Sequence, residues 1–214
     1  MNIKLVIGNK NYSTWSLRPW LLLKAFNIQF EEISESLQPD ALRDRLLVHS
    51  PAGKVPVLIE PDVLVWDSLA ICEYVSDVHL DGMGWPHTAK NRAKARAICC
   101  EMHSGFNALR AALPMNIRAK RKVALSAALE IDIARIDTIW SEHHRAGWLF
   151  ESFGIADCFY APVALRFETY NIKLSPAARA YQLKLLAHPA LLPWIKAARA
   201  ETEVVAADEA GIEV

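Results

Sequence analysis

Two serines stand just before predicted helices, where a hydroxyl group can interact with an anion. Ser13 lies in the segment 12–18 (Tyr-Ser-Thr-Trp-Ser-Leu-Arg), and Ser68 follows Asp67 at the start of a later helix. A helix N-terminus favours negative charge, so a hydroxyl there either caps the helix or stabilises a bound anion. Ser13 is therefore a candidate for holding an anion such as a thiolate, and Ser68 one for holding a carboxylate. An ordinary N-cap stays open as the alternative for both.

A third group of candidates lies on a helix that the spacing predicts over residues 88–113. His103, Asn107 and Arg110 recur at i, i+4 and i+7, which makes one polar stripe where a cation could meet an anionic substrate. A solvated helix face is the alternative. The neighbouring apolar stripe, which we expect in the core, consists of Met102, Phe106, Leu109 and Leu113.

The first 80 residues alternate between strand and helix patterns. The β-branched run 3–7 predicts a strand, a polar loop follows it, and Leu17, Trp20 and Leu21 have helical spacing. Residues 28–33 predict a second strand, and Pro39 begins a charged helix that ends near residue 48. Two apolar runs, 55–59 and 63–66, predict a hairpin, and a helix over 69–78 follows it. These elements form a β-α-β-α-β-β-α unit.

The Gly- and Pro-rich segment 81–87 predicts a domain boundary. We therefore expect an α/β domain over 1–80, a linker over 81–87 and an all-helical domain over 88–214. The other helices of this second domain are expected near 119–146, 156–170, 177–186 and 189–201. Asp157, three residues after Gly154, is expected to hydrogen-bond back to the start of its helix.

The composition excludes several classes of function. Among 214 residues, 24 Lys and Arg balance 24 Asp and Glu, so no basic surplus exists to neutralise nucleic-acid phosphates. The apolar runs are much shorter than the roughly 20 residues that span a bilayer, and residues 1–4 do not resemble a signal peptide. We expect a cytoplasmic protein that binds neither nucleic acid nor membrane.

The cysteines and histidines show no metal-binding spacing. Cys72, Cys99, Cys100 and Cys158 form no C-x-x-C motif, and the Cys99-Cys100 pair is predicted to be reduced and buried. His143-His144 is predicted to be a solvated pair. We therefore expect no metal site.

Taken together, these features resemble the cytosolic glutathione transferase family over essentially the whole chain. The features are the order of elements, Val55-Pro56 before the third strand, Asp67-Ser68 after the fourth, and the helical second part. The segment around Ser13 is similar to the serine motif of the zeta class, although Trp15 stands where zeta enzymes carry a cysteine. The chain is therefore identified with a serine-type, zeta-like bacterial branch. The resemblance implies a thioredoxin-like domain joined to an all-α domain, with glutathione as co-substrate, and a homodimer.

The resemblance also implies roles for the candidate residues. Ser13 would stabilise the glutathione thiolate: lowering a thiol pKa of about 8.5 by two units takes roughly 2.7 kcal/mol, and one hydrogen bond to a charged group supplies about 1.5 to 3 kcal/mol. Val55, before a cis-Pro56, would pair with the cysteinyl backbone, although sequence alone favours a trans bond. The remaining expected contacts are Lys54 with the glycine carboxylate, Ser68 with the γ-glutamyl carboxylate, Asp67 with the ammonium, and His103, Asn107 and Arg110 with the second substrate.

Three functions stay open at this point. The first is a transferase that adds glutathione to a small electrophile, and the second is a glutathione-dependent isomerase of the maleylacetoacetate type. The third is a regulatory protein that binds glutathione without turnover. Tyr12 stays open as an alternative to Ser13 in thiol activation, and a disulfide oxidoreductase is disfavoured because residues 9–15 contain no cysteine.

Overall fold

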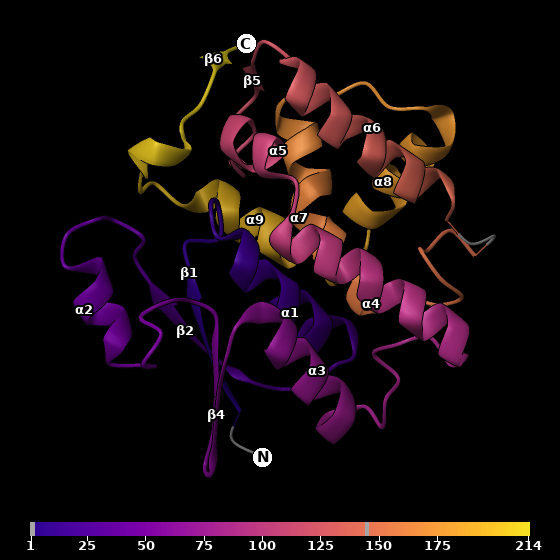
Figure 1. The fold of residues 1–214 in the computed structure, drawn as a ribbon. Coiled ribbons are helices and arrows are strands. Elements are labelled where there is room, and N and C mark those ends of the chain that lie inside the picture. The colour runs from indigo at the N-terminus through magenta and orange to yellow at the C-terminus, as the bar shows by residue number, and fades with distance from the viewer. Residues whose placement is uncertain (1–2, 144–145) are drawn as a thin grey trace.

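The computed structural model describes residues 3–143 and 146–214 and places a mixed four-stranded sheet beside a layer of helices (Figure 1). The strand order is β2-β1-β3-β4; β1 pairs with β2 in parallel, and the other neighbours are antiparallel. This is the thioredoxin-like arrangement that the family resemblance implies. The strands are β1 (Lys4–Gly8), β2 (Glu31–Glu35), β3 (Val57–Glu60) and β4 (Val63–Trp66).

Helices cover both faces of the sheet. Helices α1 (Thr14–Ala25) and α3 (Ser68–His79) lie on one side, and α2 (Leu42–Leu47) lies on the other (Figure 1). Strand β2 begins three residues later than the predicted strand 28–33. The chain turns at Asn27, whose φ of 57° is left-handed, and the pairing with β1 starts only where Glu31 lies opposite Lys4.

The helix predicted over 88–113 is wrong, because the chain breaks at Gly105 and Phe106. Phe106 has a φ of 58°, and the two pieces are α4 (Ala89–Ser104) and α5 (Asn107–Ala112). The backbone N–H of Leu109 donates to the Asp132 carboxylate at 2.9 Å, which satisfies a donor in the first turn of α5. His103, Asn107 and Arg110 therefore do not form one helical stripe. The apolar set Met102, Phe106, Leu109 and Leu113 is buried, as expected.

The remaining helices are α6 (Ala127–Ser141), α7 (Ile155–Thr169), α8 (Pro176–Leu186) and α9 (Leu192–Ala200). Helix α6 is shorter than the predicted helix 119–146, because residues 121–122 form strand β5 (Arg121–Lys122), which pairs with β6 (Ile212–Glu213) near the C-terminus. Helix α7 is buried along nearly its whole length and packs against α1, α4 and α8. The predicted pair at 143 and 144 falls partly outside the described residues.

Segment 81–87 is packed against the start of α7. Trp85 is buried, and the N–H of Ile155 donates to the Gly84 carbonyl at 2.9 Å. A Cβ at Gly154 would lie 2.8 Å from that carbonyl oxygen, which explains why the cap residue has no side chain. The N–H of Gly154 donates to the Asp157 carboxylate at 3.0 Å, which confirms the structural role of Asp157. The domain boundaries themselves stay a prediction, since one continuous core joins both parts.

The last residues return to the α/β part. After α9, the chain passes through a 3₁₀ turn, η1 (Ala206–Asp208), to reach β6. We call residues 201–214 the returning segment. Among the residues that the structure describes, no helix is long and apolar enough to cross a bilayer.

Candidate functional site

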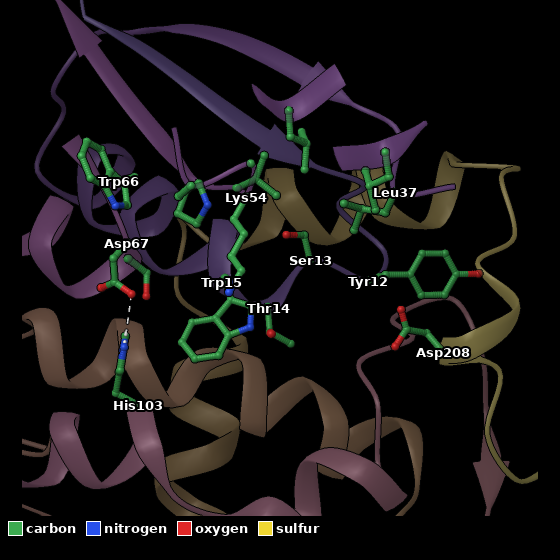
Figure 2. A pocket seen from close by; sticks show the side chains of 17 residues that line it. Tyr12, Ser13, Thr14, Trp15, Leu37, Lys54, Trp66, Asp67, His103 and Asp208 are labelled. Atoms are coloured by element: carbon green, nitrogen blue, oxygen red, sulfur yellow. Dashed lines mark ion pairs between the residues drawn. The ribbon is translucent and has the colours of Figure 1, made fainter. Parts of the chain in front are cut away.

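A cavity of about 930 Å³ lies between the α/β part and the helical part (Figure 2). This volume is at the upper end of the range typical of small-molecule sites. Most of its wall comes from loops of the α/β part, whereas α4 contributes His103 and η1 contributes Asp208. The lining residues are Tyr12, Ser13, Thr14, Trp15, Leu37, Leu42, Leu46, Ala52, Gly53, Lys54, Val55, Pro56, Trp66, Asp67, Ser68, His103 and Asp208.

Ser13 stands at the N-terminus of α1 and lines the cavity, but its side chain does not cap the helix. Its hydroxyl donates to Ser16 Oγ at 2.7 Å, and Ser16 Oγ also accepts the N–H of Gly8 at 3.1 Å. The first N–H groups of α1 have no side-chain cap, so this helix end is free to stabilise negative charge. Sequence analysis missed Ser16, although its i+3 spacing from Ser13 was a usable signal.

Tyr12 points away from Ser13, toward the returning segment (Figure 2). Its hydroxyl donates to the Glu209 carboxylate at 2.6 Å and accepts from Arg118 Nη2 at 2.7 Å. Burial raises the pKa of Tyr12, and the bond to Glu209 raises it further. The Tyr12 hydroxyl is therefore engaged in contacts that join its loop to Arg118 and to Glu209 of the returning segment.

Lys54, Val55 and Pro56 line the cavity next to one another in the chain. The Val55-Pro56 peptide bond is cis, in line with the resemblance and unlike the sequence-only expectation. In the described part of the chain, neither the N–H nor the carbonyl of Val55 makes a hydrogen bond, so both stay available to a ligand. Lys54 is exposed and extends into the cavity (Figure 2).

Asp67 and Ser68 stand at the start of α3 and do different things. Asp67 is the N-cap: its carboxylate accepts the N–H of Leu69 at 2.8 Å and lies 3.2 Å from His103 Nε2. Burial lowers the pKa of His103, which favours its neutral form at pH 7. Ser68 is buried and its hydroxyl accepts from Arg18 Nη1 at 3.2 Å. The cap of α3 is therefore Asp67, and the ordinary-cap interpretation does not hold for Ser68.

Arg18 is a buried cation behind the cavity wall. The sequence analysis did not single out this residue as part of the site. It is 1% exposed, and its guanidinium lies between the rings of Trp15 (4.3 Å) and Phe159 (4.4 Å). Its Nε has no hydrogen-bond partner in the described part of the chain, and its guanidinium donates there to the Ser68 hydroxyl rather than to a carboxylate. Burial lowers its pKa to about 9, so it is charged at pH 7.

Asn107 and Arg110 do not line the cavity, in contrast to His103. Asn107 is exposed at the start of α5. Arg110 donates to the carbonyls of Gly105 (2.9 Å) and Met102, which lie at the end of α4. Its guanidinium caps that helix end and lies 5.0 Å from the Trp15 ring.

The described residues contain no group of three His, Cys, Asp or Glu side chains placed to hold a metal ion. All four cysteines are free; Cys72, Cys99 and Cys158 are buried, and Cys100 is exposed, which corrects the expectation that both members of the adjacent pair are buried. The cavity therefore offers hydroxyl groups, a lysine, two carboxylates and a histidine as its polar groups.

Comparison with known proteins finds a matching family domain and similar folds. Residues 12–78 match the family described as "Glutathione S-transferase, N-terminal domain". A glutathione transferase homolog from Burkholderia, solved with bound glutathione, superposes with a TM-score of 0.74 at 20% identity, over 94% of this chain and 100% of that one. The fold is that of the glutathione transferases. A zeta-class bacterial maleylpyruvate isomerase superposes with a TM-score of 0.72 at 18% identity, over 94% and 100% of the two chains.

Two relatives in sequence carry different names. A probable maleylacetoacetate isomerase from Caenorhabditis elegans is 25% identical over 168 residues, which cover 76% of this chain and 78% of that protein. A stringent starvation protein A homolog from Pasteurella multocida is 24% identical over 144 residues, 67% and 66% of the two chains. Sequence similarity therefore extends to a relative named as an isomerase and to one whose name states no enzymatic activity.

Proposed function

We propose that this protein is a glutathione transferase that holds the glutathione thiolate at Ser13 and adds it to a small electrophile. The observation that carries the proposal is the Ser13 hydroxyl, which lines the cavity at an uncapped helix end and is not used as a cap. The match of residues 12–78 to the glutathione S-transferase N-terminal domain supports glutathione as the co-substrate.

The serine pair suits thiolate stabilisation. Hydroxyl groups rotate, so the Ser13 proton can turn from Ser16 to a thiolate while Ser16 donates back to Ser13 Oγ across the same 2.7 Å contact. The thiol proton leaves to solvent, and the thiolate sulfur forms a bond to the electrophilic carbon. In an addition the displaced π-electron pair takes up a proton from solvent, and in a substitution the leaving group departs with the electron pair of its bond. Neither step needs a metal or a general base. One hydrogen bond to a charged acceptor contributes about 1.5 to 3 kcal/mol, which lowers a thiol pKa by one to two units.

The other parts of glutathione have complementary groups along the cavity. In this proposal Val55, before Pro56, pairs with the cysteinyl backbone, and Lys54 binds the glycine carboxylate. Asp67 binds the γ-glutamyl ammonium and Ser68 the γ-glutamyl carboxylate. In this proposal His103, which lies 3.2 Å from the Asp67 carboxylate, orients the Asp67 side chain and so contributes to binding glutathione rather than the electrophile. Asn107 and Arg110 receive no substrate role, because they lie outside the cavity wall.

Two measurements test this function. Glutathione at a hundred times its dissociation constant stabilises a protein by about 2.7 kcal/mol, so an upward shift in Tm is expected. Ser13→Ala should lower kcat about ten- to a hundredfold without lowering Tm in the absence of ligand, because it loses one charge-assisted hydrogen bond. Tyr12→Phe is the matched control and should change kcat much less. A larger effect from Tyr12→Phe would assign thiol activation to the tyrosine.

An isomerase is the second candidate, favoured by the relatives named for that activity. In that reaction the thiolate adds to a cis double bond, the adduct rotates, and the thiolate leaves again. Conjugation consumes free thiol and isomerisation does not, so following free thiol and double-bond geometry together separates the two. Glutathione binding without either reaction would support the regulatory alternative.

The proposal extends to the whole chain. Residues 1–80 would be the glutathione-binding domain and 88–214 the substrate-binding domain, joined by 81–87, in a cytoplasmic homodimer. The support for the dimer is the family resemblance. Light scattering at micromolar concentration should give twice the mass of one chain, and the mass of one chain would contradict it.

A further inference from the structure

One end of the cavity carries a carboxylate that the chemistry proposed above does not use. Asp208, on η1, lines the wall near Tyr12 and Leu37 (Figure 2). We propose that Asp208 forms a subsite that selects electrophiles carrying a cationic group. The proposal rests on the function proposed above and specifies the class of its second substrate.

The returning segment holds Asp208 in a fixed position. The Glu201 carboxylate accepts the backbone N–H groups of Lys10 (2.7 Å) and Asn11 (3.0 Å), just before Tyr12 and Ser13. Arg118 Nη1 donates to the Glu201 carbonyl at 2.7 Å, and β6 pairs with β5 beyond η1. Contacts before η1 thus tie the returning segment to the loop that bears Ser13, and the strand pairing after η1 ties it to β5.

Asp208 differs from its neighbour Glu209 in how its charge is balanced. Glu209 accepts the Tyr12 hydroxyl and forms ion pairs with Arg118 (3.6 Å) and Arg121. Asp208 is half-buried, and in the described part of the chain its carboxylate makes no hydrogen bond and no ion pair. Glu209 therefore holds the returning segment in place, whereas the Asp208 carboxylate stays open to the cavity.

The other charges around the cavity leave Asp208 unmatched. Lys54 and Asp67 complement the glycine carboxylate and the ammonium of glutathione in our proposal, and His103 lies against Asp67. The positive charge of Arg166 lowers the pKa of Asp208, but burial raises the pKa of Asp208 by more. The Arg166 guanidinium donates to the carbonyls of Leu113 and Arg110 and forms no ion pair with Asp208. With glutathione bound, the electrophile would meet one carboxylate that has no ion-pair partner among the described residues.

The experiment compares two preformed glutathione conjugates of equal shape. One carries a 4-(trimethylammoniomethyl)benzyl group on sulfur and the other its neutral 4-(2,2-dimethylpropyl)benzyl analogue. Titration calorimetry on the full chain measures both dissociation constants without requiring turnover. We expect the cationic conjugate to bind about five- to tenfold tighter, between the values for an exposed and a buried ion pair. The preference should shrink as salt rises.

Variants assign the preference to one residue. Asp208→Asn, which keeps the side-chain shape, should bring the ratio of the two constants to about one, and Asp208→Ala should do the same. Glu209→Gln is the matched control: it should keep the preference, because its charge faces the two arginines. Equal binding of the conjugates to the native protein, or a preference that survives Asp208→Asn, would overturn the subsite.

The same titrations separate this inference from the proposed function. If both conjugates bind with the predicted preference but the protein turns over no electrophile, the subsite stands and thiol activation at Ser13 fails. If the protein conjugates glutathione to electrophiles but binds the two conjugates equally, the proposed function stands and the subsite fails. If neither glutathione nor either conjugate binds, both are overturned.

Discussion

The buried cation Arg18 gives the sharpest test of how this cavity works, because it should stabilise the ligand more than the fold. A cation isolated from water costs several kcal/mol. Two kinds of contact offset the desolvation cost of the Arg18 guanidinium. The contacts with two aromatic rings contribute about 2 kcal/mol when desolvated, and the hydrogen bond to Ser68 contributes about 1.5 to 3 kcal/mol. Because these terms nearly cancel, Arg18→Met should leave the free energy of unfolding within about 1 kcal/mol of the native value or raise it.

The same substitution should weaken glutathione binding strongly. A carboxylate that accepts the Ser68 hydroxyl would lie about 6 Å from the guanidinium, given the 3.2 Å Arg18–Ser68 contact and a further bond of about 2.7 Å. At an effective dielectric constant of about 20, two charges at that distance interact by about 2.8 kcal/mol. We therefore expect Arg18→Met to raise the glutathione dissociation constant about a hundredfold. Arg18→Lys keeps the charge and should lose less.

Urea unfolding without ligand and calorimetric titration with glutathione measure the two effects separately. Arg166→Met is the matched control, since Arg166 is also buried but its guanidinium donates to the backbone carbonyls of Leu113 and Arg110. That substitution leaves buried carbonyls without donors, so it should destabilise the fold and change glutathione affinity little. The reasoning is refuted if Arg18→Met lowers the free energy of unfolding, measured in urea, by more than about 3 kcal/mol and leaves glutathione affinity unchanged.

Further predictions concern single contacts. Ser16→Ala should lower kcat less than Ser13→Ala, with unchanged KM for the electrophile, because it removes only the support of the Ser13 hydroxyl. Tyr12→Phe should lower the free energy of unfolding by about 1 kcal/mol, measured in urea, through loss of its bonds to Glu209 and Arg118. Burial raises the pKa of Asp157 to about 6, so the native state binds more protons than the unfolded chain between about pH 4 and 6, and this residue makes the protein less stable as pH rises through that window. Asp157→Asn should remove that part of the pH profile, and an unchanged profile would contradict the assignment.

Local sequence determined the elements whose signals lie within a few residues. The strand predicted over 3–7 forms as β1 (Lys4–Gly8), and the predicted hairpin forms as β3 and β4, because side chains next to each other in sequence decide backbone conformation there. The same holds for the Asp157 box. Ser13 was likewise recognisable as a candidate from its own segment, since it combines a hydroxyl with a following helical pattern.

Tertiary structure decided everything that depends on a distant partner. Periodicity continues through residue 105, but Asp132 caps the start of α5 and Arg110 caps the end of α4, so the chain bends where a single helix was predicted. The environment of Arg18 depends on Phe159, which lies far along the chain, and no sequence pattern connects these two residues. Asp208 enters the cavity only because Glu201 binds the loop before Ser13. Sequence patterns report local preference, whereas burial of charge and closure of a cavity are set by contacts between segments that the pattern does not connect.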